Sequence, residues 1–129
     1  MEEYVKERVD NKEDIYSVVA DVAPRMLEAL RQVHSTGHIH RDVKPDNYRV
    51  HKGKLFITDF GTLKKVTDDN ENLIVVYEDD PGFAGTFAYV SVNTHYRKTQ
   101  SFRDDLEGLG YAILNLLVGD QVPWFELQT

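Results

Sequence analysis

Apolar residues recur at helical spacing in the first third of the chain. Between residues 14 and 34 they lie three or four positions apart, on one face of an α-helix that we expect to extend to about residue 36. The set comprises Ile15, Val18, Val19, Val22, Met26, Leu30 and Val33. Asn11 is the expected N-cap and Gly37 the expected stop. Pro24 should bend the helix, because an interior proline removes a backbone hydrogen bond and costs about 3 kcal/mol.

Two short β-prone runs and a polar loop follow this helix. Residues 48–50 and 55–58 are the runs, and Lys52-Gly53 between them predicts a hairpin turn. Residues 64–84 are polar and acidic, which predicts a long exposed loop. Loops of this length are usually functional or disordered.

A second helix is expected from about residue 103 to residue 118, and it is apolar almost all the way round. Its apolar positions are Leu106, Leu109, Tyr111, Ala112, Ile113, Leu114, Leu116, Leu117 and Val118. A helix without a polar face is normally buried on all sides, and the few residues after it cannot cover it. We therefore expect a mainly α fold with a small β-hairpin that looks cut short. Its exposed apolar surface would favour self-association.

Composition excludes several classes of protein. The 129 residues carry 22 Asp and Glu against 15 Lys and Arg, and a net charge of −7 argues against nucleic acid or an anionic membrane surface as partner. The absence of cysteine excludes disulfides and thiolate zinc sites. There is no apolar run long enough to span a membrane and no apolar signal-peptide segment. We expect a cytoplasmic or otherwise intracellular protein.

Two motifs flank the predicted hairpin. The sequence His-Arg-Asp-Val-Lys-Pro-Asp-Asn occupies residues 40–47, directly after the first helix, and Asp-Phe-Gly occupies residues 59–61, directly after a strand. In this order and spacing they resemble the catalytic loop and the Asp-Phe-Gly motif of eukaryotic-type protein kinases. A single Asp-Phe-Gly would be weak evidence, whereas the ordered pair on the expected helix, loop and hairpin is specific.

The resemblance implies phosphoryl transfer from ATP to a protein hydroxyl, in which catalysis is mostly positioning and charge neutralisation. Asp42 would orient the attacking hydroxyl and receive its proton, and Lys44 would direct a cation at the transferred phosphate. Asn47 and Asp59 would supply the hard oxygen ligands that Mg²⁺ prefers. Lys44 at this place resembles the Ser/Thr class rather than tyrosine kinases.

Downstream segments resemble the casein kinase 1 group, which shares its pattern with vaccinia-related and tau-tubulin kinases. They are Gly-Thr-Phe-Ala-Tyr-Val-Ser-Val-Asn-Thr-His at residues 85–95, Arg-Asp-Asp-Leu-Glu at 103–107 with Gly-Tyr at 110–111, and Pro-Trp at 123–124. The resemblance covers residues 1–125. It implies that residues 1–129 are a partial kinase domain, the large C-terminal lobe, with an activation segment at residues 59–95.

The same resemblance assigns supporting roles to four residues. Thr86 would be a catalytic residue that hydrogen-bonds near Asp42. Asp105 would cap the catalytic-loop backbone from the buried helix. His40 and Phe60 would stack on each other.

The chain also departs from the family. The Gly-rich loop, the strand lysine and the helix with its Glu partner are absent, as are the last helices. Arg49 stands where kinases place an apolar residue beneath the adenine, so the resemblance puts it at the nucleotide; a register shifted by one would instead leave Val50 facing inward. Ala88 and Phe102 replace basic residues that many casein kinase 1 relatives use to recognise acidic substrates.

Two functions remain open at this point. The first is a casein kinase 1-like Ser/Thr kinase, present as a lobe that would be inactive alone. The second is a non-catalytic regulatory or decoy lobe that binds an intact kinase. The retained Asp42, Lys44, Asn47 and Asp59 favour the first, and Arg49 and the missing small lobe favour the second.

Overall fold

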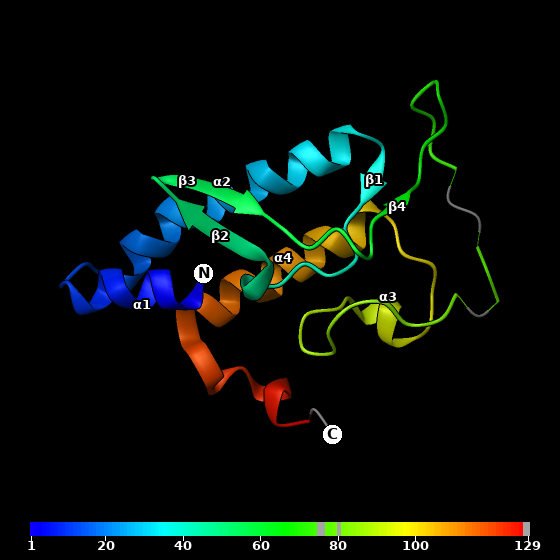
Figure 1. The fold of residues 1–129 in the computed structure, drawn as a ribbon. Coiled ribbons are helices and arrows are strands. Elements are labelled where there is room, and N and C mark those ends of the chain that lie inside the picture. Colours follow the sequence, from blue (N-terminus) through cyan, green and yellow to red (C-terminus); the bar gives the residue numbers. More distant parts are fainter. Residues whose placement is uncertain (75–76, 80, 128–129) are drawn as a thin grey trace.

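Two long helices lie side by side at the centre of the molecule, and the hairpin and loops are arranged around them (Figure 1). The computed structural model describes residues 1–74, 77–79 and 81–127. The helices are α1 (Glu2–Asp10), α2 (Ile15–Ser35), α3 (Val92–His95) and α4 (Phe102–Val118). The strands are β1 (His38–Ile39), β2 (Tyr48–His51), β3 (Lys54–Ile57) and β4 (Lys64–Lys65). Three short 3₁₀ segments are η1 (Pro45–Asn47), η2 (Gly119–Gln121) and η3 (Pro123–Leu127).

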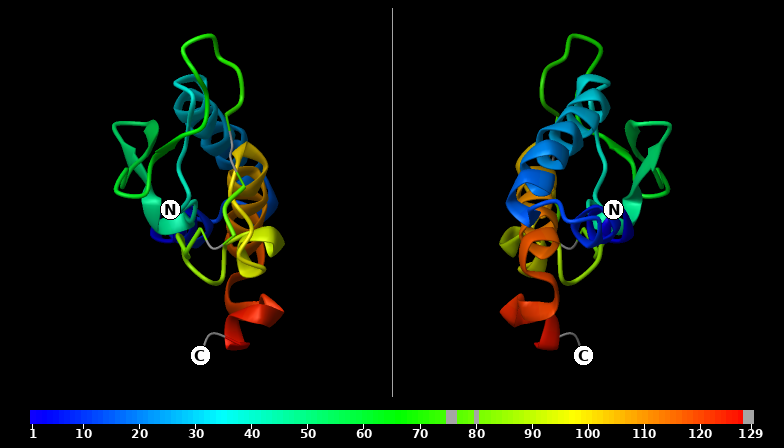
Figure 2. Two further views of the ribbon diagram at one scale, coloured as in Figure 1. Left: turned by 90° about the vertical axis from the view of Figure 1, so that its right-hand side faces the viewer. Right: turned by 90° about the vertical axis from the view of Figure 1, so that its left-hand side faces the viewer.

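The core lies between α2 and α4, and it confirms the helical stripe predicted for the first helix. Val18, Val22, Met26 and Leu30 of α2 are fully buried. They form one cluster with apolar residues of α1, β2 and α4, namely Val5, Tyr48, Leu109, Ala112 and Leu116. The mainly helical fold with a small hairpin is therefore as predicted, and the side views show the hairpin on one side of the two long helices (Figure 2).

The start of the chain differs from the expectation. Residues 2–10 form α1, which the sequence did not predict because Val5 is its only buried residue and most other positions are charged. Asn11 is the C-cap of α1, and Asp14 is the N-cap of α2, its carboxylate accepting a hydrogen bond from Ser17 N at 3.0 Å. The N-cap of α2 is therefore Asp14, three residues after the predicted N-cap Asn11.

Helix α2 is continuous through Pro24. The proline lacks the N–H that would bond to the carbonyl of Ala20. Ala20 and Pro24 are both exposed, so water can satisfy that carbonyl.

The hairpin forms where it was predicted. Strands β2 and β3 are antiparallel, and the turn between them has Lys52 and Gly53 at φ +50° and +74°. The Tyr48 hydroxyl donates to the carbonyl of Met26 at 3.1 Å, which fixes the hairpin to α2, and burial raises the pKa of Tyr48. Arg49, paired with Phe56, is exposed on the outer face.

The predicted loop at residues 64–84 is partly ordered, so that prediction was wrong for its first half. Strand β4 pairs with β1, and Thr67 forms an isolated bridge with Leu73. The Asp68 carboxylate accepts hydrogen bonds from the backbone N–H groups of Asn70 and Asn72, both at 2.9 Å, which holds the turn and lowers the pKa of Asp68. Residues 75, 76 and 80 of the predicted loop lie outside the described residues.

Helix α4 starts one residue earlier than predicted, behind a capping box formed by Ser101 and Asp104. Its burial is one-sided: Leu109 and Ala112 are buried, whereas Leu106 is 46% and Val118 38% exposed. Within the described part of the chain, no helix is long and apolar enough to cross a membrane.

Gly37 offers a test of how the end of α2 is joined to the ladder of β1 and β4. Its φ is +80°, and an added Cβ would lie 2.0 Å from Thr67 Oγ1, whereas Gly53 has φ +74° and open space around it. We expect Gly53→Ala to cost roughly 1–2 kcal/mol of unfolding free energy from backbone strain alone. Gly37→Ala should cost about 1–3 kcal/mol more because the clash adds to the strain. Urea unfolding followed by circular dichroism measures both. Equal losses for the two variants would show that the Thr67 contact does not constrain the fold.

Candidate active site

A buried carboxylate on α4 holds the backbone of residues 40 and 41. Asp105, 2% exposed, accepts hydrogen bonds from His40 N at 2.7 Å, Arg41 N at 2.9 Å and the His34 ring Nε2 at 2.8 Å. Arg41 has φ +73°, a conformation that an L-residue adopts at a cost. The two charge-assisted bonds to the backbone offset that cost. The predicted cap by Asp105 is thus present, with His34 as an additional donor.

His40 links this loop to the segment before Asp59. The imidazole is fully buried; its Nδ1 accepts from Asp42 N at 3.2 Å and its Nε2 donates to the carbonyl of Thr58 at 2.9 Å. The ring also contacts Phe60, with centroids 5.8 Å apart, but the two rings meet edge-on and are not stacked as predicted. His40 is therefore a structural residue that fixes the spacing of the two motifs.

The Asp42 carboxylate lies at the centre of a polar cluster. Thr86 Oγ1 donates to Asp42 Oδ1 at 2.8 Å, and Lys44 Nζ donates to Thr86 Oγ1 at 2.9 Å. Lys44 Nζ also lies 3.6 Å from Asp42 Oδ2, and Asn47 Nδ2 donates to the carbonyl of Asp42 at 2.7 Å and to Oδ2 at 3.3 Å. The side chains of Asp42 and Lys44 remain 15% and 22% exposed, so a substrate group can reach them. The structure thus brings together four of the residues predicted from the sequence.

Asp59 directly follows Thr58, which is hydrogen-bonded to Asn47 in η1. Thr58 N donates to the backbone oxygen of Asn47 at 2.7 Å, which places the residue before Asp59 against η1. Asp59 is exposed, has φ +64°, and its carboxylate accepts from Gly61 N at 3.4 Å.

The side-chain oxygen atoms of Asn47 and Asp59 fit a magnesium ion that is also bound by phosphate groups. Asn47 uses its nitrogen toward Asp42, so its Oδ1 and the Asp59 carboxylate are oxygen ligands of the kind Mg²⁺ takes. No cluster of three or more His, Asp or Glu that could hold a metal by itself occurs among residues 1–74, 77–79 and 81–127. Mg²⁺ sites built from one or two protein ligands plus substrate phosphates need no such cluster.

Arg49 is exposed on the outer face of the hairpin. Its guanidinium donates to the carbonyl of Asp46 and, at 3.3 Å, to that of Tyr48. With Asp46, Met1 and Glu3 it lines an open hollow of about 720 Å³ between α1 and β2. In the observed strand register, Arg49 faces outward. Val50 lies on the same side of β2 as the buried Tyr48.

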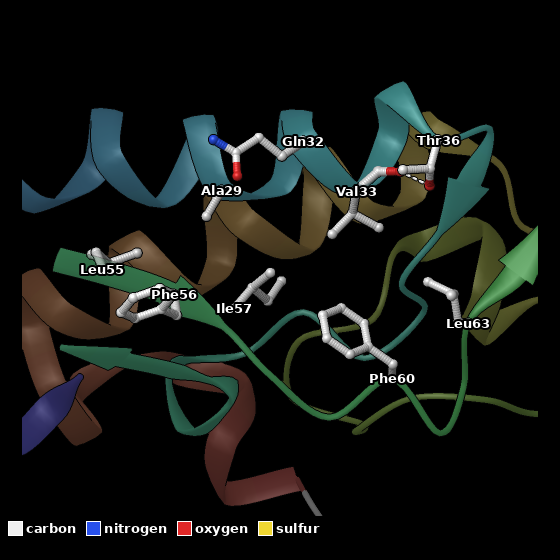
Figure 3. A pocket seen from close by; sticks show the side chains of 9 residues that line it. All are labelled: Ala29, Gln32, Val33, Thr36, Leu55, Phe56, Ile57, Phe60 and Leu63. Atoms are coloured by element: carbon white, nitrogen blue, oxygen red, sulfur yellow. Dashed lines mark hydrogen bonds between the residues drawn. The ribbon is translucent and has the colours of Figure 1, made fainter. Parts of the chain in front are cut away.

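A second hollow, mostly apolar, lies between α2 and β3 (Figure 3). It has a volume of about 390 Å³, and its lining includes Ala29, Val33, Ile57, Phe60 and Leu63. Phe60 is 53% exposed here, so only one side of its ring is covered by His40. Self-association through such surface stays a prediction.

The geometry agrees with a family comparison. The family model described as protein kinase domain matches residues 2–128. The chain belongs to the protein kinase family. Protein kinases generally act on protein substrates with ATP and magnesium, and the cluster around Asp42 stands where the kinase motif predicts it.

Two residues that support the kinase site were not found from the sequence. His34 donates to Asp105 from the last turn of α2. The Thr62 hydroxyl donates to the carbonyl of His40 at 2.7 Å, and the Thr62 carbonyl accepts from Arg41 Nε at 2.6 Å. Neither a histidine near a helix end nor a threonine after a glycine belongs to a sequence motif with a distinctive spacing. Both become visible only when α4 and the catalytic loop are placed together.

The adjacent carboxylates Asp104 and Asp105 allow a matched test of this support. Both are buried, at 4% and 2%, but Asp104 contacts Ser91 and Ser101 N instead of the catalytic loop. Asp105→Asn should orphan one backbone donor at a cost of about 1–3 kcal/mol and speed hydrogen exchange at the amides of residues 40 and 41. Asp104→Asn should leave these amides protected and loosen residue 101 instead. Unchanged exchange at residues 40 and 41 in Asp105→Asn would contradict the assigned role.

Proposed function

We propose that this chain is the large lobe of a casein kinase 1-like Ser/Thr kinase. Such a kinase transfers a phosphoryl group from ATP to a protein hydroxyl. The observation that carries the proposal is the hydrogen-bonded set of Asp42, Lys44, Thr86 and Asn47. A carboxylate that accepts hydrogen bonds from Thr86 and Asn47, lies 3.6 Å from the Lys44 ammonium and is still partly open to solvent is suited to orient a hydroxyl.

In this proposal each side chain has a distinct task. The substrate hydroxyl donates to the Asp42 carboxylate, which receives the proton as the phosphoryl group moves. Thr86 fixes the orientation of Asp42, and Lys44 places a positive charge where phosphate oxygens would lie. Mg²⁺, held by Asn47 and Asp59, would neutralise negative charge on the ATP phosphates.

Contacts between the two group-specific segments support the casein kinase 1 assignment. Ser91 Oγ donates to Asp104 Oδ1 at 2.5 Å, and Val92 N donates to Glu107 Oε1 at 2.9 Å. Glu107 also accepts from the Tyr111 hydroxyl at 2.6 Å, which raises the pKa of Tyr111 to about 12. The Ser-x-Asn and Arg-Asp-Asp-Leu-Glu segments therefore have a structural reason to occur together.

The alternative is a non-catalytic lobe that binds an intact kinase. Arg49 favours it, because a charged side chain lines the open hollow beside the hairpin where the resemblance places the adenine. Under either alternative we propose an intracellular setting, because the phosphoryl transfer of this kinase, or of the intact kinase that the lobe would bind, uses ATP.

Titration with Mg·ATP tests the nucleotide side of the proposal. The 129-residue chain should bind no tighter than about millimolar, because well-bound ligands are usually buried over 70–90% of their surface and this hollow is open. Arg49→Leu should tighten ATP, by at most the roughly 1.5–3 kcal/mol of burying one such side chain. Weaker binding by Arg49→Leu would show that the arginine is itself a nucleotide ligand.

The catalytic roles require a chain completed with a kinase small lobe, by fusion or by a partner. There Asp42→Asn should lower phosphate transfer by roughly 10²–10⁴-fold and leave nucleotide affinity almost unchanged. Asp59→Asn should lower both, because it removes a magnesium ligand. Transfer to a protein substrate and calorimetric titration read the two effects separately. Full transfer by Asp42→Asn would refute the catalytic role, and a completed wild-type chain without any transfer would favour the non-catalytic alternative.

A further inference from the structure

The polar hollow beside the hairpin is bounded by two walls that belong to different parts of the chain. Helix α1 forms one wall, with Glu3 and Glu7 among its lining residues, and strand β2 forms the other, with Arg49 and Val50. The hollow has a volume of about 720 Å³. Its width therefore depends on how firmly α1 and the hairpin are held in place.

Helix α1 is weakly anchored by apolar contacts. It has nine residues, and Val5 is its only buried side chain. A helix this short is marginal in water by itself, so its tertiary contacts decide whether it stays folded. The connection to α2 passes through Lys12 at φ +71°, a left-handed conformation that an L-residue adopts at a cost. Polar contacts must therefore contribute to the position of α1.

Arg8 ties α1 to the start of the next helix. Its Nε and Nη2 atoms donate to the two carboxylate oxygens of Glu13 at 3.0 and 2.6 Å, and its Nη1 donates to Asp21 Oδ2 at 2.6 Å. The guanidinium also lies 5.6 Å from the centre of the Tyr4 ring. Hydrogen bonding to Arg8 holds the pKa of both carboxyl groups below their usual range. The arginine thus joins α1 to α2 across Lys12.

Asp21 also accepts from a second arginine, which reaches the other wall. Arg25 Nη1 donates to Asp21 Oδ2 at 3.4 Å, and Arg25 Nη2 donates to the carbonyl of Gly53 in the hairpin turn at 2.6 Å. The same carboxylate oxygen is therefore shared by Arg8 and Arg25. Both walls of the hollow are tied through these arginines to one residue of α2.

We propose that Asp21 is the centre of an ionic latch that holds the two walls of the polar hollow in place, through Arg8 for α1 and through Arg25 for the hairpin. When the latch breaks, α1 moves about the connection at residues 11–13 and the hollow opens. Exposed ion pairs are individually weak and are screened by salt, so the latch opens and closes without unfolding of the core between α2 and α4. The latch controls access to the hollow, and this inference does not depend on the proposed phosphoryl transfer.

Amide hydrogen exchange of the 129-residue chain, followed by NMR at low salt, tests the latch. Arg8→Met should speed exchange in α1 roughly two- to ten-fold and leave exchange in β2 and β3 unchanged, because it removes only the ion pairs that hold α1. Arg25→Met should speed exchange in the hairpin and leave α1 unchanged. Asp21→Asn should speed exchange in both α1 and the hairpin, since both arginines lose the charge of their shared acceptor.

Arg31→Met is the matched control. Arg31 forms a similar two-atom contact with Glu28, at 2.7 and 2.6 Å, but both residues belong to α2. This variant should leave exchange in α1 and in the hairpin unchanged. Raising the salt concentration about ten-fold should speed exchange of α1 in the wild type and have little effect in Arg8→Met, whose latch is already broken.

A cysteine introduced into this cysteine-free chain separates movement of α1 from unfolding of the whole molecule. Val5→Cys places a thiol beneath α1, and Val22→Cys places one on α2, where residue 22 is fully buried. Combining each with Arg8→Met should make the thiol at residue 5 react faster with a thiol reagent. The thiol at residue 22 should react at an unchanged rate, because only α1 moves.

Two results would overturn the proposal. One is exchange in Asp21→Asn that speeds up in only one of the two walls, or in neither. The other is equal acceleration of the two cysteine reactions by Arg8→Met, which would show that the arginine stabilises the whole fold rather than the position of α1.

Discussion

The Asp105 carboxylate, buried on α4, is the interaction on which the rest of the site depends. It accepts two backbone N–H groups of the catalytic loop and one imidazole nitrogen. A buried charge is costly unless it is paired or hydrogen-bonded, and here the donors lie on α2 and on the loop. The same bonds hold Arg41 in a left-handed conformation, after which the chain turns to present Asp42. The position of the Asp42 carboxylate therefore follows from the packing of α2 against α4.

Helix α4 also fixes the distance between the two halves of the site. Asp104 contacts Ser91, in the segment that carries Thr86, while its neighbour Asp105 contacts the catalytic loop. Two consecutive carboxylates thus anchor two different segments to one helix. The Thr86–Asp42 hydrogen bond of 2.8 Å forms between segments that are both attached to α4, so little further ordering is needed to make it.

The two sides of the polar cluster around Asp42 differ in how much ordered structure the described residues place there. On the side of residues 85–90, Thr86 begins a tight turn in which its carbonyl accepts hydrogen bonds from Tyr89 N and Val90 N. Toward the hairpin, the hollow is open and polar, with Arg49 on its wall. The described residues thus form an ordered turn on one side of the cluster and an open, polar hollow on the other.

The sequence by itself determined the elements whose signals are local. The apolar spacing of α2, the turn at Lys52-Gly53 and the apolar run of α4 each gave the right element, because burial of one face or one turn conformation fixes the residue types. The kinase motifs likewise named Asp42, Lys44, Asn47 and Thr86 before any contact was seen. Only the tertiary structure decided the rest. Helix α1 and the pairing of β1 with β4 have too few buried side chains to leave a pattern. His34 and Thr62 gain their roles from contacts between segments far apart in the chain, and such contacts depend on packing rather than on local spacing.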